Sequence, residues 1–236
     1  MRGPLPQVQQ GRVLSDWVTE SLREAILNGY FAPGEKIDQD LVAEELKVSR
    51  TPVREALKSL EFEGFVEVRP HYGAFIAVVS PRGVREVYEV RSLLESEVVR
   101  QVTLLIPDGV LDELWSSLAE SQAGLDAGNT TKNFENDINF HQTLIDLVDN
   151  RLIKELLDGL ANRVSMVRRL AQLKPGVHLP ESLGEHRVII EAMQERDAEK
   201  AAKLMHDHLH TSSLRIRELA RAMEAGPGRT AATPDV

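Results

Sequence analysis

The chain of 236 residues contains no cysteine, and only 5% of its residues are aromatic. The absence of cysteine excludes disulfide bonds and thiolate metal ligands. No apolar run approaches the roughly 20 residues that span a bilayer, and the N-terminus lacks the pattern of a signal peptide. We therefore expect a cytoplasmic protein that makes no membrane contact.

The 28 Lys and Arg are outnumbered by 37 Asp and Glu, and the net charge of −9 argues at first against a nucleic-acid partner. The first 80 residues carry 9 Lys and Arg against 12 Asp and Glu, a net charge of −3. Residues 47–58 differ, because four basic residues there face one acid, Glu55. Local charge governs contact with phosphates, so this segment permits DNA binding within an acidic protein.

The same segment has the pattern of a short helix with one cationic face. Pro52 fits only the first turn of a helix, and Ser49 or Thr51 can serve as the N-cap before it. Apolar residues recur at helical spacing on one side: Val53, Ala56, Leu57 and Leu60. Arg50, Arg54 and Lys58 follow one another at four-residue intervals on another side, with Thr51 beside them. Arginine on such a face suits the O6/N7 edge of guanine.

The flanking residues predict a winged helix-turn-helix domain. Helices are expected over residues 13–27 and 38–46, and the turn 47–49 leads from the second into the basic helix. Apolar residues at 65–68 and 75–78 around a Pro-His-Tyr-Gly tip predict a β-hairpin. Arg69, His71 and Tyr72 at this tip can reach a minor groove or phosphates; the alternative is an ordinary exposed turn.

The run from PGEKIDQ to HYGAFIA, with SRTPVREAL at its centre, resembles the N-terminal domain of GntR-superfamily bacterial transcription regulators over residues 12–78. The resemblance implies that Arg50, Thr51 and Arg54 reach bases and phosphates and that Gly73 enters the minor groove. The full predicted DNA-binding set is Ser49, Arg50, Thr51, Arg54, Lys58, Arg69, His71, Tyr72 and Gly73. Some relatives place an arginine where Asp40 stands, so that contact is missing here.

After Ser80-Pro81 the chain reads as six helices and no strand, over residues 84–105, 110–127, 131–148, 152–173, 181–194 and 198–223. The predicted fold class is mainly α: a winged helix domain over 12–79 and an all-α effector-binding and dimerisation domain over 80–224. Residues 1–11 and 225–236 are expected to be disordered. The second domain resembles the FCD effector domain of FadR-type GntR regulators, in its six-helix, VanR-like branch.

Four polar residues are expected on apolar helix faces of this bundle. Asp137 and His141 lie one turn apart, and His186 and His208 share faces with large apolar residues, whereas His206 and His210 fall on the solvent side. Each histidine alone fits a buried core position. Together, and matching the FCD pattern D-x3-H, E-H and H-L, the four predict a divalent metal site. The resemblance implies zinc, nickel or manganese, and mixed nitrogen and oxygen ligands do not choose among them.

Two arginines are also expected on inward helix faces. Arg91 either pairs with Glu95, four residues on, or clamps the carboxylate of an effector. Arg163 occupies a similar position, with the alternative that its side chain extends outward to solvent.

These features predict a transcription regulator, and a repressor is the more frequent role in the family. A small carboxylate or sugar acid, bound at the metal and arginine, would control affinity for a double-stranded palindromic operator. A homodimer is expected because one recognition helix offers few base contacts. One alternative is a regulator that senses the metal itself. A metal-dependent hydrolase with a DNA-binding appendage, using Glu185 as base, is the other, although we expect no enzyme.

Overall fold

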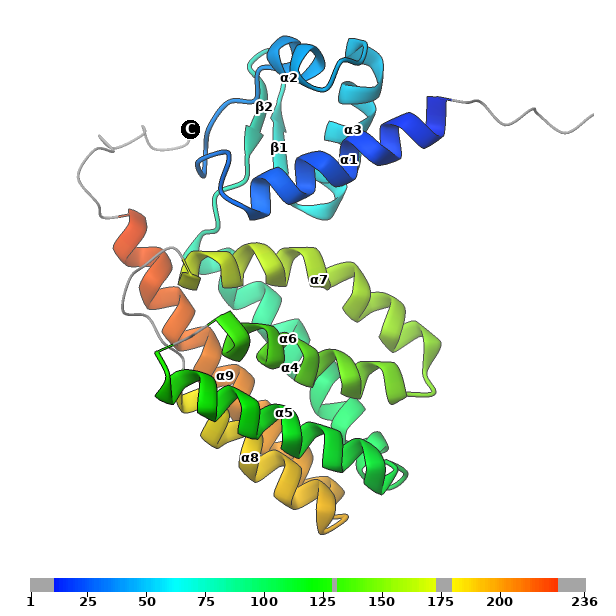
Figure 1. Ribbon diagram of the computed structural model, residues 1–236, viewed down its shortest axis with the longest axis vertical. Helices are drawn as coiled ribbons and strands as arrows, with labels where there is room; N and C mark the ends of the chain where they lie inside the picture. The colour runs from blue at the N-terminus through cyan, green and yellow to red at the C-terminus, as the bar shows by residue number, and fades with distance from the viewer. Residues whose placement is uncertain (1–10, 129–130, 173–179, 225–236) are drawn as a thin grey trace, which may run out of the picture. The chain divides into compact units, whose positions relative to one another are not determined.

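The computed structural model describes residues 11–128, 131–172 and 180–224 and divides the chain into two compact units, residues 1–79 and 80–236 (Figure 1). Nearly all of the predicted disordered arm and the whole predicted tail lie outside the described residues. Among the helices that the structure describes, none combines the length and apolar character needed to cross a bilayer.

The N-terminal unit is the predicted helix-turn-helix with a two-stranded wing. It contains α1 (Gly11–Leu27), α2 (Gln39–Glu45), α3 (Arg50–Glu63), β1 (Val66–Arg69) and β2 (Gly73–Ile76). The strands pair antiparallel, from Val66 opposite Ile76 to Arg69 opposite Gly73. Helix α1 packs on α3, and fully buried Val18, Val53 and Leu60 form the centre of this core.

Local sequence explains where these helices begin and end. Asp38 caps α2, since its Oδ1 accepts hydrogen bonds from the amides of Asp40 at 2.9 Å and Leu41 at 3.2 Å. Ser49 occupies the N-cap position of α3 in an extended conformation, without a side-chain capping bond. Gly64 ends α3 with a φ of 85°, the left-handed conformation that glycine adopts without strain.

The C-terminal unit is all-α in its described residues, and the predicted fold class is confirmed. Its helices are α4 (Pro81–Thr103), α5 (Asp108–Asp126), α6 (Thr131–Leu147), α7 (Arg151–Gln172), α8 (Pro180–Gln194) and α9 (Ala198–Glu224). Helix α4 packs along α9, while α8 lies against both α5 and α9 (Figure 1). Ser80 starts α4, because its Oγ accepts a hydrogen bond from the amide of Gly83 at 3.0 Å.

Candidate nucleic-acid interface and metal centre

Helix α3 presents its polar side to solvent and its apolar side to the core. Arg50, Arg54 and Lys58 are exposed, as are Ser49 and Thr51. The opposite face is buried, with Val53 and Leu60 at 0% exposure. The basic side chains are therefore exposed on the side where a phosphate backbone or a base edge could lie, while the apolar side fixes the helix to its domain.

Asp40 of α2 pairs with the first basic residue of α3. Its Oδ1 contacts Nε of Arg50, and the two side chains are 59% and 71% exposed. Asp40 thus offsets the charge of one of the exposed basic residues of α3. Sequence reasoning singled out Asp40 but did not predict this contact.

The wing tip depends on two residues in the left-handed region, His71 with a φ of 66° and Gly73 with a φ of 108°. A Cβ added at Gly73 would lie 3.2 Å from Cε of Lys36, so glycine suits the position for space as well as for conformation. Arg69 pairs with Glu67 at 2.9 Å and lies 4.5 Å from the ring centroid of Phe75. Tyr72 is 71% exposed and points away from the core.

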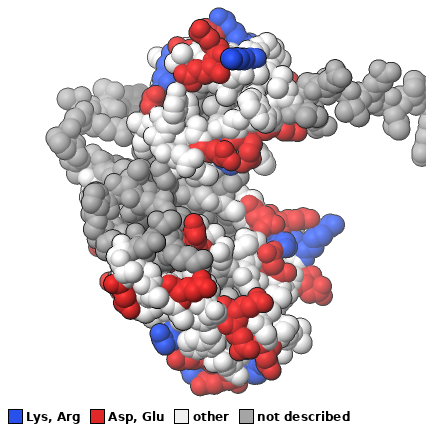
Figure 2. Space-filling model, viewed as in Figure 1, with Lys and Arg blue, Asp and Glu red and all other residues white. Residues whose placement is uncertain are grey.

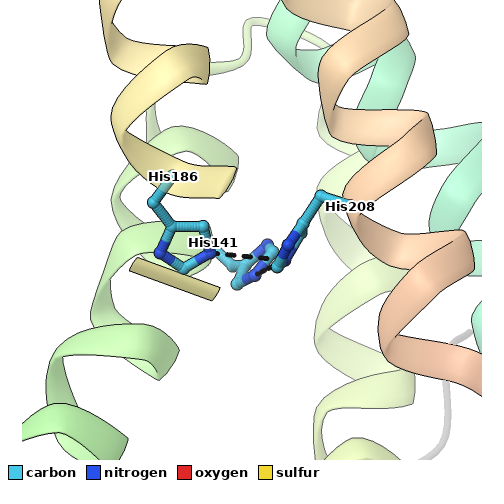
Figure 3. Close-up of side chains that lie close together, drawn as sticks. All are labelled: His141, His186 and His208. Carbon is cyan, nitrogen blue, oxygen red and sulfur yellow. Dashed lines mark hydrogen bonds between the residues drawn. The ribbon is translucent and has the colours of Figure 1, made fainter. Parts of the chain in front are cut away.

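In the second unit, three histidines from three helices converge (Figure 3). His141 of α6, His186 of α8 and His208 of α9 are 4%, 2% and 3% exposed. Nε2 of His208 lies 3.3 Å from Nε2 of His186 and 3.3 Å from Nε2 of His141. The ring of His186 stacks on Phe140, with centroids 3.9 Å apart. His206 and His210 are exposed, as the helical periodicity predicts.

Each of two histidines contacts a carboxylate through its other ring nitrogen. Nδ1 of His141 lies 2.6 Å from Oε2 of Glu95, and Nδ1 of His208 lies 2.7 Å from Oε2 of Glu185. Burial raises the pKa of Glu95, but the charge of Arg91, together with the contact from His141, outweighs it and holds that pKa well below its usual range. Burial likewise raises the pKa of Glu185, while hydrogen bonds from His208 and Arg215 bring it below its usual value. Both carboxylates are therefore ionised.

An ionised carboxylate only accepts hydrogen bonds, so Nδ1 of His141 and Nδ1 of His208 carry the protons. In a neutral imidazole the other nitrogen, Nε2, then has a lone pair and no proton. The two Nε2 atoms are 3.3 Å apart, and with both rings neutral their lone pairs repel; a second proton on one ring or a cation between them removes that repulsion. Ligands around tetrahedral zinc, at Zn–N distances of about 2.0–2.1 Å, are about 3.3 Å apart. The donor set therefore fits a metal ion held by His141, His186 and His208.

Asp137, the fourth predicted ligand, lies beside this triad. Its Oδ1 is 3.6 Å from Nε2 of His186, and its side chain is 15% exposed. The buried triad can hold a metal ion, whose identity the donor types leave open, and a part for Asp137 as a further ligand stays a prediction.

Arg91 pairs with Glu95, the first of its two predicted alternatives. Its Nε lies 2.6 Å from Oε1 of Glu95, and both side chains are less than 5% exposed. Nη1 of Arg91 is buried and has no hydrogen-bond partner among the described residues. Arg91, Glu95 and His141 line a cavity of ≈ 70 Å³, together with Leu157, Ala161 and Val164 of α7.

Arg163 does not lie where the sequence predicts. Its side chain is exposed, and the buried face of α7 contains Leu157, Met166 and Val167. The prediction followed a stripe through Leu156, which is 51% exposed. The inward face of this amphipathic helix is therefore rotated from the predicted one, and Arg163 extends outward, as its alternative expects.

Acidic side chains gather on the visible face of the C-terminal unit, and basic and acidic groups are mixed on the N-terminal unit (Figure 2). This distribution agrees with the net charge of −9. The exposed basic side chains of α3 therefore stand out locally in a protein whose overall charge is negative.

Comparison with protein families decides the identity. The model of the FCD domain matches residues 86–211, more than half of the chain, and the model of the gntR family of bacterial regulatory proteins matches residues 14–76. The chain belongs to the GntR family. This GntR protein carries a helix-turn-helix domain followed by an FCD domain, the arrangement of a DNA-binding transcription regulator.

Its relatives are transcription regulators and not enzymes. The GntR protein is 28% identical to the HTH-type transcriptional repressor RspR of Escherichia coli K12, over 90% of this chain and 93% of the relative. It is 24% identical to the gluconate operon transcriptional repressor of Bacillus subtilis 168, over 86% and 84%. A crystal structure of a GntR regulator from Rhodococcus sp. RHA1 is 25% identical, with a TM-score of 0.69 over 86% of this chain and 96% of the other.

Glu185, the base named for the hydrolase alternative, is already engaged by other side chains. Glu185 is engaged by His208 and by Arg215, whose Nη2 lies 2.6 Å from Oε1 of the glutamate. Glu95 is shared between Arg91 and His141. Both carboxylates therefore contact side chains of the candidate metal site.

Proposed function

We propose that this protein represses transcription and that a small carboxylate, bound at a metal ion in the FCD domain, lowers its affinity for operator DNA. The metal would be held by His141, His186 and His208, with Asp137 completing the protein ligands. As a bound Lewis acid, the metal would attract a carboxylate oxygen.

The observation that carries this proposal is the spare donor of Arg91. Glu95 occupies Nε of that guanidinium, while Nη1 remains without a partner beside the cavity that His141 also lines. A buried donor without an acceptor costs about 1–3 kcal/mol. A carboxylate oxygen in the cavity would satisfy it and make a charge-assisted hydrogen bond.

The size of the cavity suggests how binding would move the protein. A volume of ≈ 70 Å³ accepts a carboxylate group, whereas ligand pockets typically measure about 300–1,000 Å³. Gluconate, named for the Bacillus subtilis relative, is a sugar acid and requires more room. A ligand of that size would displace α7, and a population shift in the bundle would then reach the DNA-binding domains.

The operator is proposed to be palindromic and to bind a homodimer in the bacterial cytoplasm. One α3 helix with a few exposed polar side chains offers too few base contacts for a specific site. A two-fold dimer doubles those contacts, and the spacing between its two α3 helices must match the spacing between half-sites. An effector that changes the helix spacing would therefore change operator affinity.

The test begins with an operator selected from random duplex DNA by the purified protein. Operator affinity is then measured by fluorescence anisotropy for metal-stripped protein, with zinc, and with zinc plus gluconate or acetate. We expect zinc plus one of the carboxylates to weaken binding by about 5–150-fold, the usual range of allosteric coupling. Arg91→Gln should reduce the carboxylate response, and Arg100→Gln, at an exposed site on the same helix, should not. No response to any carboxylate would refute the effector part.

A second function is favoured by the Arg91–Glu95 pair itself. If Arg91 stays paired with Glu95 in every state of the protein, its guanidinium does not need an effector carboxylate as its counter-ion. The protein would then respond to the metal ion alone. A full change in operator affinity on adding zinc, with no further change on adding carboxylates, would establish this metal-sensing function instead.

A further inference from the structure

The metal site has two arms built on the same plan. On one, Arg91 contacts Glu95 at 2.6 Å and Glu95 contacts Nδ1 of His141 at 2.6 Å. On the other, Arg215 contacts Glu185 at 2.6 Å and Glu185 contacts Nδ1 of His208 at 2.7 Å. In each arm an arginine fixes a carboxylate, which in turn contacts the nitrogen of an imidazole that faces away from the other two histidines.

We infer that Glu95 and Glu185 are positioning residues of the metal centre. Each carboxylate accepts the Nδ1 proton of its histidine, which fixes the tautomer and ring orientation and directs the Nε2 lone pair toward the ion. The negative charge behind each ring also raises the basicity of Nε2 and so strengthens the bond to the metal. This inference rests on the proposed metal site and assigns functions to residues outside the triad.

Glu185 shows why spacing along the chain does not reveal this arrangement. It precedes His186 directly, yet successive residues on a helix point about 100° apart and do not share a face. The carboxylate of Glu185 therefore reaches across to His208 on α9 while His186 projects toward the triad. On α8, His186 thus supplies one metal ligand, while Glu185 orients a second ligand, His208. The contact between Glu185 and His208 also joins α8 to α9.

Glu185→Gln is the decisive substitution because the change is small and the site is partly open. The side chains of Glu185 and Arg215 are each 25% exposed, so Arg215 can turn to solvent when the carboxylate charge is removed. Glutamine still offers a carbonyl oxygen to Nδ1 but without the negative charge. We expect zinc affinity to fall by about 10–100-fold, the usual effect of removing such a partner.

The measurement is a competition between full-length, metal-stripped protein and a chromophoric zinc chelator at pH 7.5. The melting temperature of the metal-free protein is recorded in parallel, since a merely structural role would lower stability and leave zinc affinity in the folded protein unchanged. Glu191→Gln, at an exposed position on the same helix, is the matched control and should keep wild-type affinity. Glu95→Gln tests the other arm, with Glu97→Gln at a more exposed site of α4 as its control.

Zinc affinity of Glu185→Gln within twofold of wild type would overturn the inference, as would an equal loss in Glu191→Gln. Glu95→Gln is the harsher change, because Arg91 would keep a buried charge without its counter-ion. If that variant does not fold, Glu185→Gln decides alone. A wild-type protein that binds no zinc, nickel or manganese would instead overturn the metal site itself.

Discussion

Replacing His208 by alanine separates a metal ligand from an ordinary helix residue, because the same helix supplies a matched control two residues earlier. His208 is 3% exposed, and its Nε2 lies 3.3 Å from both other histidines of the triad. His206 has a side chain that is 57% exposed and lies 3.5 Å from Asp207. His208→Ala removes one of the three proposed nitrogen ligands, whereas His206→Ala removes none.

The expected effect of zinc on stability follows from mass action. At a zinc concentration 100 times the Kd of wild type, binding stabilises the folded protein by about 2.7 kcal/mol. For a chain of this size, that free energy raises Tm by about 5–11 °C. If His208→Ala weakens zinc binding by about 100-fold, the same zinc concentration contributes only about 0.4 kcal/mol and about 1–2 °C.

Thermal unfolding of metal-stripped protein, followed by circular dichroism with and without zinc, measures these shifts. Wild type and His206→Ala should gain the same Tm increase, and His208→Ala should gain almost none. Equal increases in the two variants would refute the assignment of His208 to the metal and of His206 to solvent.

Three further substitutions test other contacts. Arg54→Ala should weaken operator binding by about 10–100-fold without changing the circular dichroism spectrum, since one bidentate base contact contributes about 1–3 kcal/mol; unchanged anisotropy titrations would remove Arg54 from the recognition surface. Asp40→Ala should strengthen binding to random duplex DNA by about two- to fivefold, because it frees Arg50 from an exposed ion pair of about 0.2–1 kcal/mol; Glu44→Ala, an exposed acid on the same helix, is the control. Arg91→Met should cost about 3–5 kcal/mol in urea unfolding because it leaves Glu95 buried without its guanidinium, and adding Glu95→Gln should restore at least half of the loss; a double variant as unstable as the single one would contradict that pairing.

Much of the fold followed from local patterns in the sequence. Pro52 inside a first turn, glycine at 64 and the Ser80-Pro81 break each have direct backbone consequences, and the helices begin and end within a few residues of the predicted positions. The inward positions of Arg91, His141, His186 and His208 also followed, because strong helical periodicity places a residue on a face. The prediction failed for α7, because it took the stripe through Leu156, which is exposed, as the inward one and so assigned Arg163 to the wrong side.

The contacts between helices could not be predicted in the same way. Asp40 with Arg50, Glu185 with His208 and Glu95 with His141 all join residues on different helices. Periodicity gives the direction of a side chain but not the rotation and height of the neighbouring helix. One signal in the sequence could have predicted these pairs. A buried arginine and inward histidines require acidic partners nearby, and in the folded bundle those partners are Glu95 and Glu185.

The central claim is that the histidine triad holds a metal ion through which operator affinity is controlled. The most direct measurement compares the operator Kd of wild type and His208→Ala by fluorescence anisotropy, metal-stripped and with zinc plus carboxylate. The account predicts a change of at least fivefold in wild type and no change in His208→Ala. An operator Kd in wild type that is the same in both conditions would contradict it.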